Sequence, residues 1–243
     1  MIIKDFLFKL KQDLKLLFLY PKNDLRSDFK VDYEKYWKKR GRTDKPVLSS
    51  WQKQRADFLT SMIEPGSVVL DIGCGDGMVL KYLLDKIQVR GIGVDLELGI
   101  LKHAQDLGIE TISMDVTEID KLKNLPEADY IIGLEILEHM PNPEEFLHHV
   151  RMKARKGLIF SFPNTGYYAH RLRLLFGKFP LQWIIHPGEH LRYWTVSDVK
   201  YWLNSLSFLL DSMVLYECLP IFNKIVPSLF SQGILINISE KKN

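Results

Sequence analysis

A glycine-rich loop follows the first run of apolar residues that is typical of a β-strand. The run at 68–72 leads without a break into Asp71-Ile-Gly-Cys-Gly-Asp-Gly77. The loop residues are Gly73, Cys74, Gly75, Asp76 and Gly77. Glycine lets the backbone approach a ligand closely and adopt positive φ angles. In an open α/β sheet, ligands bind at the turn between a strand and the next helix, so we expect this loop to form part of a binding site.

The residues around the loop favour one kind of ligand. Dinucleotide sites use the spacing G-x-G-x-x-G, whereas this loop has G-x-G-x-G and an acid, Asp71, at the strand end. A carboxylate there repels a pyrophosphate but attracts a cationic amino group or a sulfonium. Asp95, followed by Leu96, ends the next β-type run, where an acid can accept both ribose hydroxyls. Asp115 and Val116 follow the third run and could bind adenine. Together these residues predict a site for S-adenosylmethionine.

Two carboxylates and an imidazole follow the fourth β-type run, in Glu135-Ile-Leu-Glu138-His139. This place is beside the expected position of the methyl group. His139 could be a general base that removes a hydroxyl proton while the oxygen attacks the methyl carbon. The group could also bind a hard cation, Mg²⁺ or Mn²⁺. A third interpretation is that Glu138 and His139 only cap the next helix. The residue types leave all three open.

Charge is distributed unevenly along the chain, although the formal net charge is only +3. The stretch 110–145 holds ten carboxylates and two lysines, whereas 146–188 holds seven Lys or Arg residues and no acid. We expect five side chains of the basic stretch to grip a phosphate or carboxylate of the acceptor: Asn164, Tyr167, Tyr168, Arg171 and Arg173. The alternative is a solvated basic surface. Nucleic acid is disfavoured because the net charge is slight and no RNA-binding domain is attached.

The elements that would position these residues alternate between strand and helix patterns. The chain has 243 residues, 46% of them apolar, which is enough for a packed core. The β-type runs are 68–72, 89–95, 110–114, 130–134, 157–162, 208–217 and 234–239. Helical patterns cover 50–63, 78–86, 97–107, 143–153 and 195–206. This alternation predicts an α/β fold with a doubly wound, mostly parallel sheet.

The N-terminal part is expected to be a separate extension. We assign 1–49 to an amphipathic helix and a polar connecting segment, and 50–243 to one domain with an acceptor-side insert at about 163–194. The helix has apolar residues three and four apart from Ile3 to Phe18 and lysines on the other flank. It could lie on an anionic membrane surface, or pack on its own protein or on the second copy of a homodimer. Two cysteines and the lack of a signal-peptide pattern favour a cytoplasmic location.

The three acidic strand ends resemble those of class I S-adenosylmethionine-dependent methyltransferases. The resemblance rests on Val-Val-Leu-Asp-Ile-Gly-Cys-Gly-Asp-Gly at 68–77, Gly-Val-Asp-Leu at 93–96 and Met-Asp-Val at 114–116, and it covers roughly residues 50 to 239. It implies a Rossmann-like sheet of seven strands with an antiparallel last strand. It also implies cofactor binding by Asp71, Gly73, Gly75, Asp95 and Asp115, with Cys74, Asp76, Gly77, Leu96, Val116 and Glu135 completing the site.

The sequence Glu-x-x-Glu-His at 135–139 resembles the ubiquinone-biosynthesis O-methyltransferases and the small-RNA 3′-end 2′-O-methyltransferases. In the RNA enzymes these three residues and a later histidine, four residues before a Trp-Thr pair, bind a divalent metal. This chain has His190 at that spacing before Trp194-Thr195. The resemblance therefore implies a metal site of Glu135, Glu138, His139 and His190, with His139, Glu138 and Glu135 as the catalytic group.

The segment after the fifth β-type run resembles the MetW-type proteins of methionine biosynthesis. The match rests on Ser-Phe-Pro-Asn-x-Gly, Arg-Leu-x-Leu-Leu and Gly-x-x-Pro within 161–180. Those proteins are methyltransferase-like and assist homoserine acetylation, which implies a non-catalytic partner. The Glu135, Glu138 and His139 set departs from that pattern and favours an enzyme. Because similar chains accompany polysaccharide biosynthesis, we expect an O-methyltransferase for a small anionic cell-envelope precursor, with a partner protein or an RNA methyltransferase as the alternatives.

Overall fold

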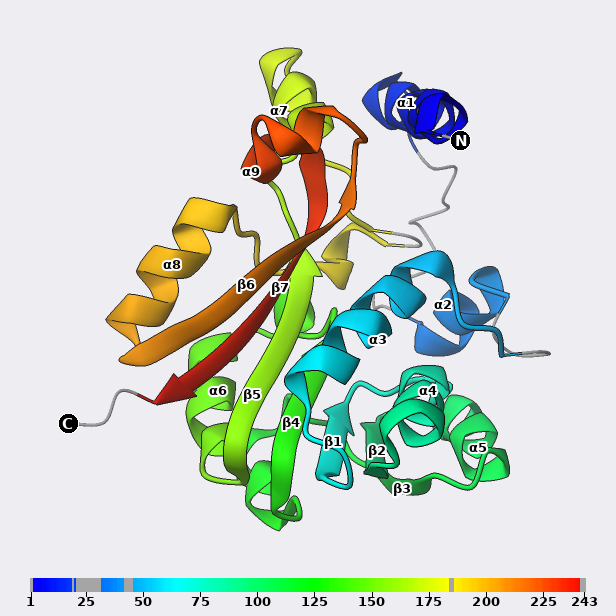
Figure 1. Ribbon diagram of the computed structural model, residues 1–243, viewed down its shortest axis with the longest axis vertical. Coiled ribbons are helices and arrows are strands. Elements are labelled where there is room, and N and C mark those ends of the chain that lie inside the picture. The colour runs from blue at the N-terminus through cyan, green and yellow to red at the C-terminus, as the bar shows by residue number, and fades with distance from the viewer. Residues whose placement is uncertain (1, 19, 21–31, 42–45, 184–185, 241–243) are drawn as a thin grey trace.

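The computed structural model describes residues 2–18, 20, 32–41, 46–183 and 186–240. At the centre of this described part is a seven-stranded sheet with the order β3-β2-β1-β4-β5-β7-β6 (Figure 1). Its parallel part consists of β1 (Val68–Ile72), β2 (Arg90–Asp95), β3 (Glu110–Ser113), β4 (Ala128–Leu134) and β5 (Ala154–Pro163). β7 (Ser231–Glu240) lies antiparallel between β5 and β6 (Phe208–Cys218). The expected doubly wound sheet with an antiparallel last strand is confirmed.

Helices cover both faces of the sheet because side chains alternate between the faces along each strand. They are α3 (Ser50–Met62), α4 (Met78–Ile87), α5 (Leu98–Asp106), α6 (Pro143–Arg151) and α8 (Val196–Ser205). Leu70 and Ile72 of β1 belong to the buried cluster that includes α6 and α8. Val69 between them belongs to the cluster that includes α3, α4 and α5. The two cores fix the sheet so that the carboxyl ends of β1, β2 and β4 meet at one edge.

Helix starts agree with the local sequence where a side chain can cap them. Ser49 accepts the N–H of Gln52 at the start of α3, and the Gln52 side chain accepts in return from the Ser49 backbone. Thr195 and Asp198 form the same reciprocal pair at the start of α8. These caps fix where α3 and α8 begin, and α3 supplies residues that line the cavities described below.

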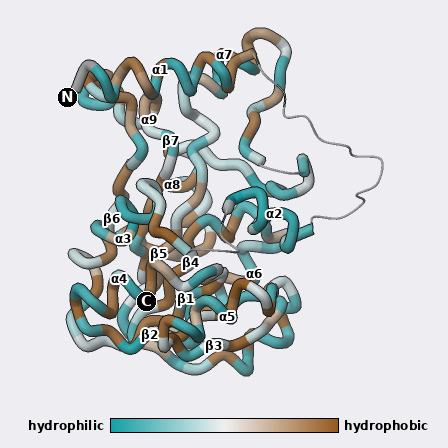
Figure 2. Tube along the Cα trace, turned by 90° about the vertical axis from the view of Figure 1, so that its right-hand side faces the viewer, coloured by the Kyte–Doolittle hydropathy of each residue, from teal (hydrophilic) through white to brown (hydrophobic). Residues whose placement is uncertain are grey.

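The N-terminal helix α1 (Ile2–Phe18) packs against α7 (Tyr168–Leu175), which belongs to the insert after β5. Figures 1 and 2 place both helices at the same end of the molecule, with α9 (Pro227–Phe230) beside them. A short helix, α2 (Tyr33–Lys39), occupies part of the segment that the sequence pattern assigned to a polar connection. Among the described helices, none has the length and apolar character that crossing a bilayer would require.

Candidate active site

The glycine loop at the end of β1 needs glycine at three positions. Gly73, Gly75 and Gly77 have φ angles of +76°, +55° and +75°, a left-handed region that other residues adopt only with strain. The N–H groups of Gly73 and Cys74 donate to the carbonyl of Val94 in β2, at 2.8 and 3.0 Å. The loop is therefore folded back across the strand ends, with its backbone turned toward the space above the sheet.

This loop forms one wall of a cavity of about 280 Å³, here called the first pocket. The expected cofactor residues that line it are Asp71, Gly73, Cys74, Asp95, Leu96, Asp115, Val116 and Glu135. Three other expected residues, Gly75, Asp76 and Gly77, shape the loop instead. Asp76 accepts the N–H of Met78 at 3.2 Å at the start of α4. A Cβ on Gly77 would lie 2.7 Å from the Cβ of Ala104, so only glycine allows α5 to pack there.

The acids in the first pocket differ in how they are held. Asp71 is 2% exposed, and its Oδ1 has no hydrogen-bond partner among the described residues. Burial, and then repulsion from Asp95, raises the pKa of Asp71 to about 7. Asp95 accepts the N–H groups of Gly75 and Glu97 at 2.9 and 3.1 Å, and burial raises its pKa. The unpaired oxygen of Asp71 is suited to accept a hydrogen bond from a cationic amino group.

Helix α2 covers the first pocket and supplies lining residues that the sequence analysis missed. Tyr33, Tyr36, Trp37 and Arg40 all reach the cavity. The Trp37 ring rests on the glycine loop, because a Cβ on Gly75 would lie only 2.6 Å from Trp37 Cη2. The available signal was three aromatic residues within five positions of an otherwise polar segment, which a simple linker would not need.

A second cavity of about 200 Å³, the second pocket, adjoins the first. Four residues line both cavities: Tyr36, Arg40, Glu135 and His139. Side chains from α1, α7 and the insert complete the second pocket, among them Leu16, His170 and Gln182. A ligand in the first pocket and a second molecule in the adjoining one would therefore meet beside Glu135 and His139.

Glu135 occupies this junction in a strained backbone conformation. Its φ angle is +61°, and its N–H donates to the carbonyl of Ser161 at 2.9 Å. The carboxylate Oε1 accepts the hydroxyls of Ser161 and Tyr216 at 3.0 and 2.6 Å and forms an ion pair with Arg55 at 3.0 Å. Residues of β5, β6 and α3 therefore hold the Glu135 carboxylate. The expectation that Glu135 joins the other three candidate metal ligands is therefore not met in the structure.

Glu138, His139 and His190 do come together. One ligand atom from each lies within 4.8 Å of the others. Glu138 is 1% exposed and neither carboxylate oxygen has a hydrogen-bond partner among the described residues, while Oε1 is 3.9 Å from His139 Nε2. Burial, and then the Glu135 charge, raises the pKa of Glu138. Burial lowers the pKa of His139, and burial and then His139 lower the pKa of His190 to about 3.

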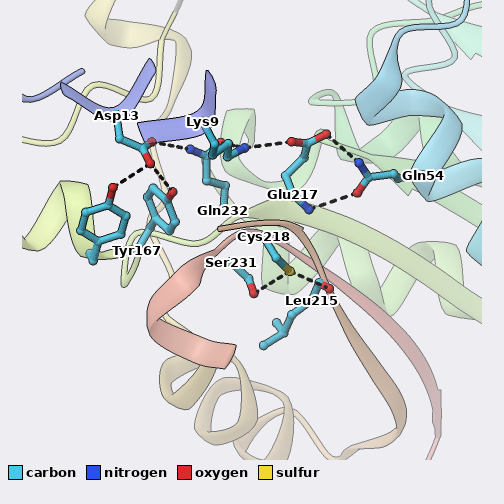
Figure 3. Close-up of polar contacts among 10 residues, drawn as sticks. Lys9, Asp13, Gln54, Tyr167, Leu215, Glu217, Cys218, Ser231 and Gln232 are labelled. Atoms are coloured by element: carbon cyan, nitrogen blue, oxygen red, sulfur yellow. Dashed lines mark hydrogen bonds and ion pairs between the residues drawn. The ribbon is translucent and has the colours of Figure 1, made fainter. Parts of the chain in front are cut away.

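Tyr167, Tyr168 and Arg173, expected to bind the acceptor, line neither pocket and hold α1 instead. The hydroxyls of Tyr167 and Tyr168 donate to Asp13 at 2.7 and 2.8 Å (Figure 3). The Arg173 Nη1 donates to the carbonyl of Leu16 at 2.6 Å, at the C-terminal end of α1. Because these groups are committed to α1, they do not form an anion-binding surface in this structure.

Asn164 and Arg171 are also used within the fold. The amide of Asn164 donates to the carbonyls of Ser228 and Ser231, both at 2.8 Å, and so ties the end of β5 to the start of β7. The Nε of Arg171 donates to the carbonyl of Gly166 at 2.7 Å. These polar side chains could be chosen from the sequence. Their partners could not, because they lie far away in the chain or in local turns that residue spacing does not reveal.

Comparisons with known proteins show which families this chain resembles. Residues 54–217 match the family described as methionine biosynthesis protein MetW. The chain is 27% identical over 182 residues to the bifunctional methionine biosynthesis protein MetXA/MetW of Rhodopirellula baltica, covering 66% of this chain and 28% of that protein. It is 27% identical over 131 residues to a ubiquinone biosynthesis O-methyltransferase of an Azoarcus species, covering 51% of this chain and 56% of that protein.

The fold is also similar to solved structures. A SAM-dependent methyltransferase from Archaeoglobus fulgidus superposes with a TM-score of 0.62 and 19% identity, covering 85% of this chain and 99% of that one. This similarity shows the class I methyltransferase fold. The chain covers only 28% and 56% of the lengths of the two curated relatives above.

Proposed function

Since the chain belongs to the family of the methionine biosynthesis protein MetW, we propose that it is an S-adenosylmethionine-dependent O-methyltransferase that acts on a small acceptor in the second pocket. The observation that carries this proposal is the meeting of the two pockets beside Glu135 and His139. A partner protein without catalytic activity would need no such junction. The proposal keeps the cytoplasmic location expected from the sequence.

The first pocket fits S-adenosylmethionine, which when bound supplies an activated methyl group on a sulfonium. Asp71 offers a buried, unpaired oxygen to the amino group, and Asp95 is placed to accept ribose hydroxyls. Asp115 and Val116 line the part of the cavity suited to adenine. The Trp37 ring packs on the loop, where it would help to exclude water from a bound cofactor. Positioning of two reactants in adjoining pockets would supply much of the rate.

His139 is the group best placed to take a proton from the acceptor hydroxyl. Its Nδ1 faces the carbonyl of Glu189, so the ring is oriented with Nε2 toward Glu138 and the second pocket. Burial lowers its pKa, which keeps the imidazole neutral and able to accept a proton near neutral pH. Glu135 is not free to act as a base because Arg55 and Tyr216 hold its carboxylate.

A divalent metal ion is compatible with the same residues and is a second element of the proposal. Glu138, His139 and His190 would hold the ion, which would lower the pKa of a bound hydroxyl. The fit rests on the two buried, unpaired oxygens of Glu138 and on the carbonyl of Glu189, which orients His139 as outer-shell partners of metal sites do. One carboxylate and two imidazoles suit a transition-metal ion such as Mn²⁺ better than Ca²⁺.

The acceptor that we propose is a small hydroxyl compound with an anionic group, such as a phosphorylated or sugar-like cell-envelope precursor. Support comes from Arg40, the cationic side chain that lines both pockets. The second pocket also offers Gln182, Gln232 and His170 for polar contacts. The arginines of α7 no longer support an anionic acceptor, so Arg40 carries that part of the proposal.

Calorimetry tests cofactor binding directly. We expect micromolar binding of S-adenosylmethionine. Asp95→Asn should weaken it at least tenfold, because the charge-assisted hydrogen bonds of the carboxylate with the two ribose hydroxyls are lost. Asp106→Asn, at an exposed position on α5, is the control and should bind as the unchanged chain does. No heat of binding in the unchanged chain would contradict the proposal.

Methyl transfer separates an enzyme from a partner protein. A screen with methyl-labelled cofactor across nucleotide-sugars and phosphorylated metabolites should give a labelled product. His139→Asn should lower kcat on the order of 100-fold and should change cofactor affinity much less. Cofactor binding without any transfer would favour the MetW-type partner function instead, and transfer to single-stranded RNA alone would favour the RNA methyltransferase.

Titration with Mn²⁺ alone, followed by calorimetry and electron paramagnetic resonance, tests the metal site. Glu138→Gln and His190→Ala should each remove binding, whereas Glu135→Gln should retain it, since Glu135 faces Arg55. His149→Ala, at an exposed position on α6, is the control. If Glu138→Gln binds Mn²⁺ as the unchanged chain does, the metal site is wrong and His139 acts as a plain base.

A further inference from the structure

Helix α1 buries two of its charged residues and exposes several large apolar residues, beside other charged residues that reach solvent. Lys9 and Asp13 are 8% and 1% exposed, whereas Leu7, Phe8 and Phe18 are 56%, 65% and 65% exposed. The buried pair is fully engaged, as Figure 3 shows: Lys9 forms an ion pair with Glu217 at 2.8 Å, and Asp13 accepts from Tyr167 and from Gln232. An amphipathic helix on a soluble domain normally turns its large apolar residues toward the core.

Two segments at the same end of the molecule as α1 also expose apolar side chains (Figure 1). Phe6 of α1 stacks on Phe222 with ring centroids 6.0 Å apart. Figures 1 and 2 show α1 and α7 along one end of the molecule, with α9 beside them. The exposed apolar side chains of these segments are Leu7, Phe8, Leu14, Phe18, Leu174, Leu175, Phe176, Phe179, Ile221, Phe222, Ile225 and Val226. We call this surface the α1 face.

The charges on the α1 face are almost all positive. On residues 2–18, 168–180 and 219–230, the basic side chains that reach solvent are Lys4, Lys11, Lys15, Arg171, Lys178 and Lys224. One acid, Asp5, reaches solvent on the same segments. The Lys178 ammonium lies 6.0 Å from the Phe18 ring centroid, which places a cation at the border of the apolar area. The face thus combines exposed aromatic and aliphatic side chains with a rim of lysines.

We propose that the α1 face docks on the surface of a bilayer that contains anionic lipid. Apolar side chains would enter the interface between head groups and acyl chains, and the lysines would pair with lipid phosphates. Aromatic residues and long basic side chains are the types that such interfaces favour. The helix needs no folding step on the membrane, because the buried ties of Lys9 and Asp13 already hold it on the protein.

The charge distribution distinguishes this occupant from a second copy of the chain. In a symmetric dimer the same patch meets itself, so the lysines of α1 would be brought close to the lysines of the partner α1. Such like charges oppose association, and no acid other than Asp5 is available among the described residues of the face to compensate. An anionic lipid surface has the complementary charge.

Vesicle flotation with the unchanged full chain tests the proposal. Vesicles of phosphatidylcholine with 30% phosphatidylglycerol are compared with phosphatidylcholine alone, each at about 0.1 and 0.5 M salt. We expect binding only to the anionic vesicles and loss of most of it at high salt. The variant Lys4→Gln/Lys11→Gln/Lys15→Gln should lower the partition coefficient about 100-fold. The variant Phe8→Ser should lower it about tenfold.

Matched controls keep the result interpretable. Lys102→Gln/Lys123→Gln/Lys200→Gln removes three exposed lysines elsewhere, and Met152→Ser removes an exposed apolar side chain directly after α6. Both should bind vesicles unchanged, and all variants should keep the Tm and the cofactor affinity of the unchanged chain. Equal binding to both vesicle types, or no binding, would overturn the proposal. So would a dimer in sedimentation that Phe8→Ser dissociates, because the α1 face would then be a protein interface.

Discussion

Asp71 shows how one buried carboxyl group can couple cofactor binding to pH. In the folded chain its pKa is raised from the ordinary value of 3.8 to about 7, by burial first and by Asp95 second. A cationic ligand favours the ionised form, so a proton must leave Asp71 when the ligand binds below that pH. Affinity should therefore rise with pH up to about 7 and then level off.

The prediction is checked by calorimetry with S-adenosylmethionine between pH 5.5 and 8. Affinity should fall up to tenfold for each pH unit below 7, and Asp71→Asn should give weak binding with a flat profile. Asp85→Asn, an exposed carboxyl on α4, should keep the slope. A flat profile in the unchanged chain would show that Asp71 ionises normally.

The raised pKa of Asp71 also predicts that stability changes with pH in the direction opposite to cofactor affinity. Without ligand, the unfolded carboxyl ionises near pH 4 whereas the folded one retains its proton up to about 7. Stability should therefore fall as the pH rises between these values, and Asp71→Asn should raise the free energy of unfolding at pH 8 by on the order of 1–3 kcal/mol. Chemical denaturation of the ligand-free chain at pH 5 and 8 measures the difference. Asp71 is thus kept at a cost in stability.

At the scale of single elements, α2 packs directly against the glycine loop. Trp37 occupies the space that a Cβ on Gly75 would need, with Cη2 only 2.6 Å away. Trp37→Ala should weaken cofactor binding about tenfold, because the cover of the first pocket opens. Gly75→Ala should weaken it through both backbone strain and the clash with the ring.

A double-mutant cycle measured by calorimetry checks this coupling. In Trp37→Ala/Gly75→Ala the clash is relieved, so the loss should be smaller than the sum of the two single losses. Gly108→Ala is the matched control, since Gly108 has a φ of +78° with no atom within 4 Å of an added Cβ. Strictly additive losses would mean that α2 does not rest on the loop in solution.

The elements also show what the sequence could and could not predict. Alternating apolar runs gave the sheet, and acids at three strand ends gave the first pocket, because both depend on local spacing. His190 lies beside His139, a neighbourhood that the resemblance to the RNA methyltransferases implied from its position four residues before Trp194. Glu135 was misplaced in the metal set, because its φ of +61° and its pairing with Arg55 arise from tertiary contacts. Helix α2 was not predicted because its aromatic residues line the first pocket and do not pack in the hydrophobic core.

At the scale of the whole molecule, the basic stretch does not form one surface. Arg155 and Lys156 near the start of β5 pair with Glu127 and Glu64, whereas Tyr167 and Arg173 bind α1 at the other end. The two groups lie at opposite ends of β5, and neither group lines the first or the second pocket. The acidic stretch is likewise divided between pocket residues and exposed pairs. Net charge along the sequence was therefore a poor guide to the acceptor.

The attachment of α1 gives a prediction for the molecule as a whole. Asp13 accepts from the Tyr167 and Tyr168 hydroxyls and from Gln232, all within 3.1 Å. Asp13→Ala leaves these donors without a partner and should weaken docking of α1 by about 3 kcal/mol. Hydrogen exchange in α1 and trypsin cleavage at its lysines should become faster, while the sheet stays protected.

Gln12→Ala, at an exposed position one residue away, is the control and should leave both rates unchanged. Because Leu16 lines the second pocket, Asp13→Ala should also loosen acceptor binding without changing cofactor affinity. Slow exchange in α1 of the Asp13→Ala variant would show that the contacts of Lys9 and Arg173, together with apolar packing, hold the helix without Asp13.

The bond from Arg173 to the end of α1 has an evolutionary consequence. Arg173 is fully buried and donates to the carbonyls of Leu16 and Leu17, so a chain without α1 would leave these hydrogen bonds of the guanidinium unmade. The region that matches the family, 54–217, contains Arg173 but not α1. Relatives that lack an α1 should therefore have a smaller, neutral residue at this position, and the helix and the arginine should have been gained or lost together in the ancestry of the family.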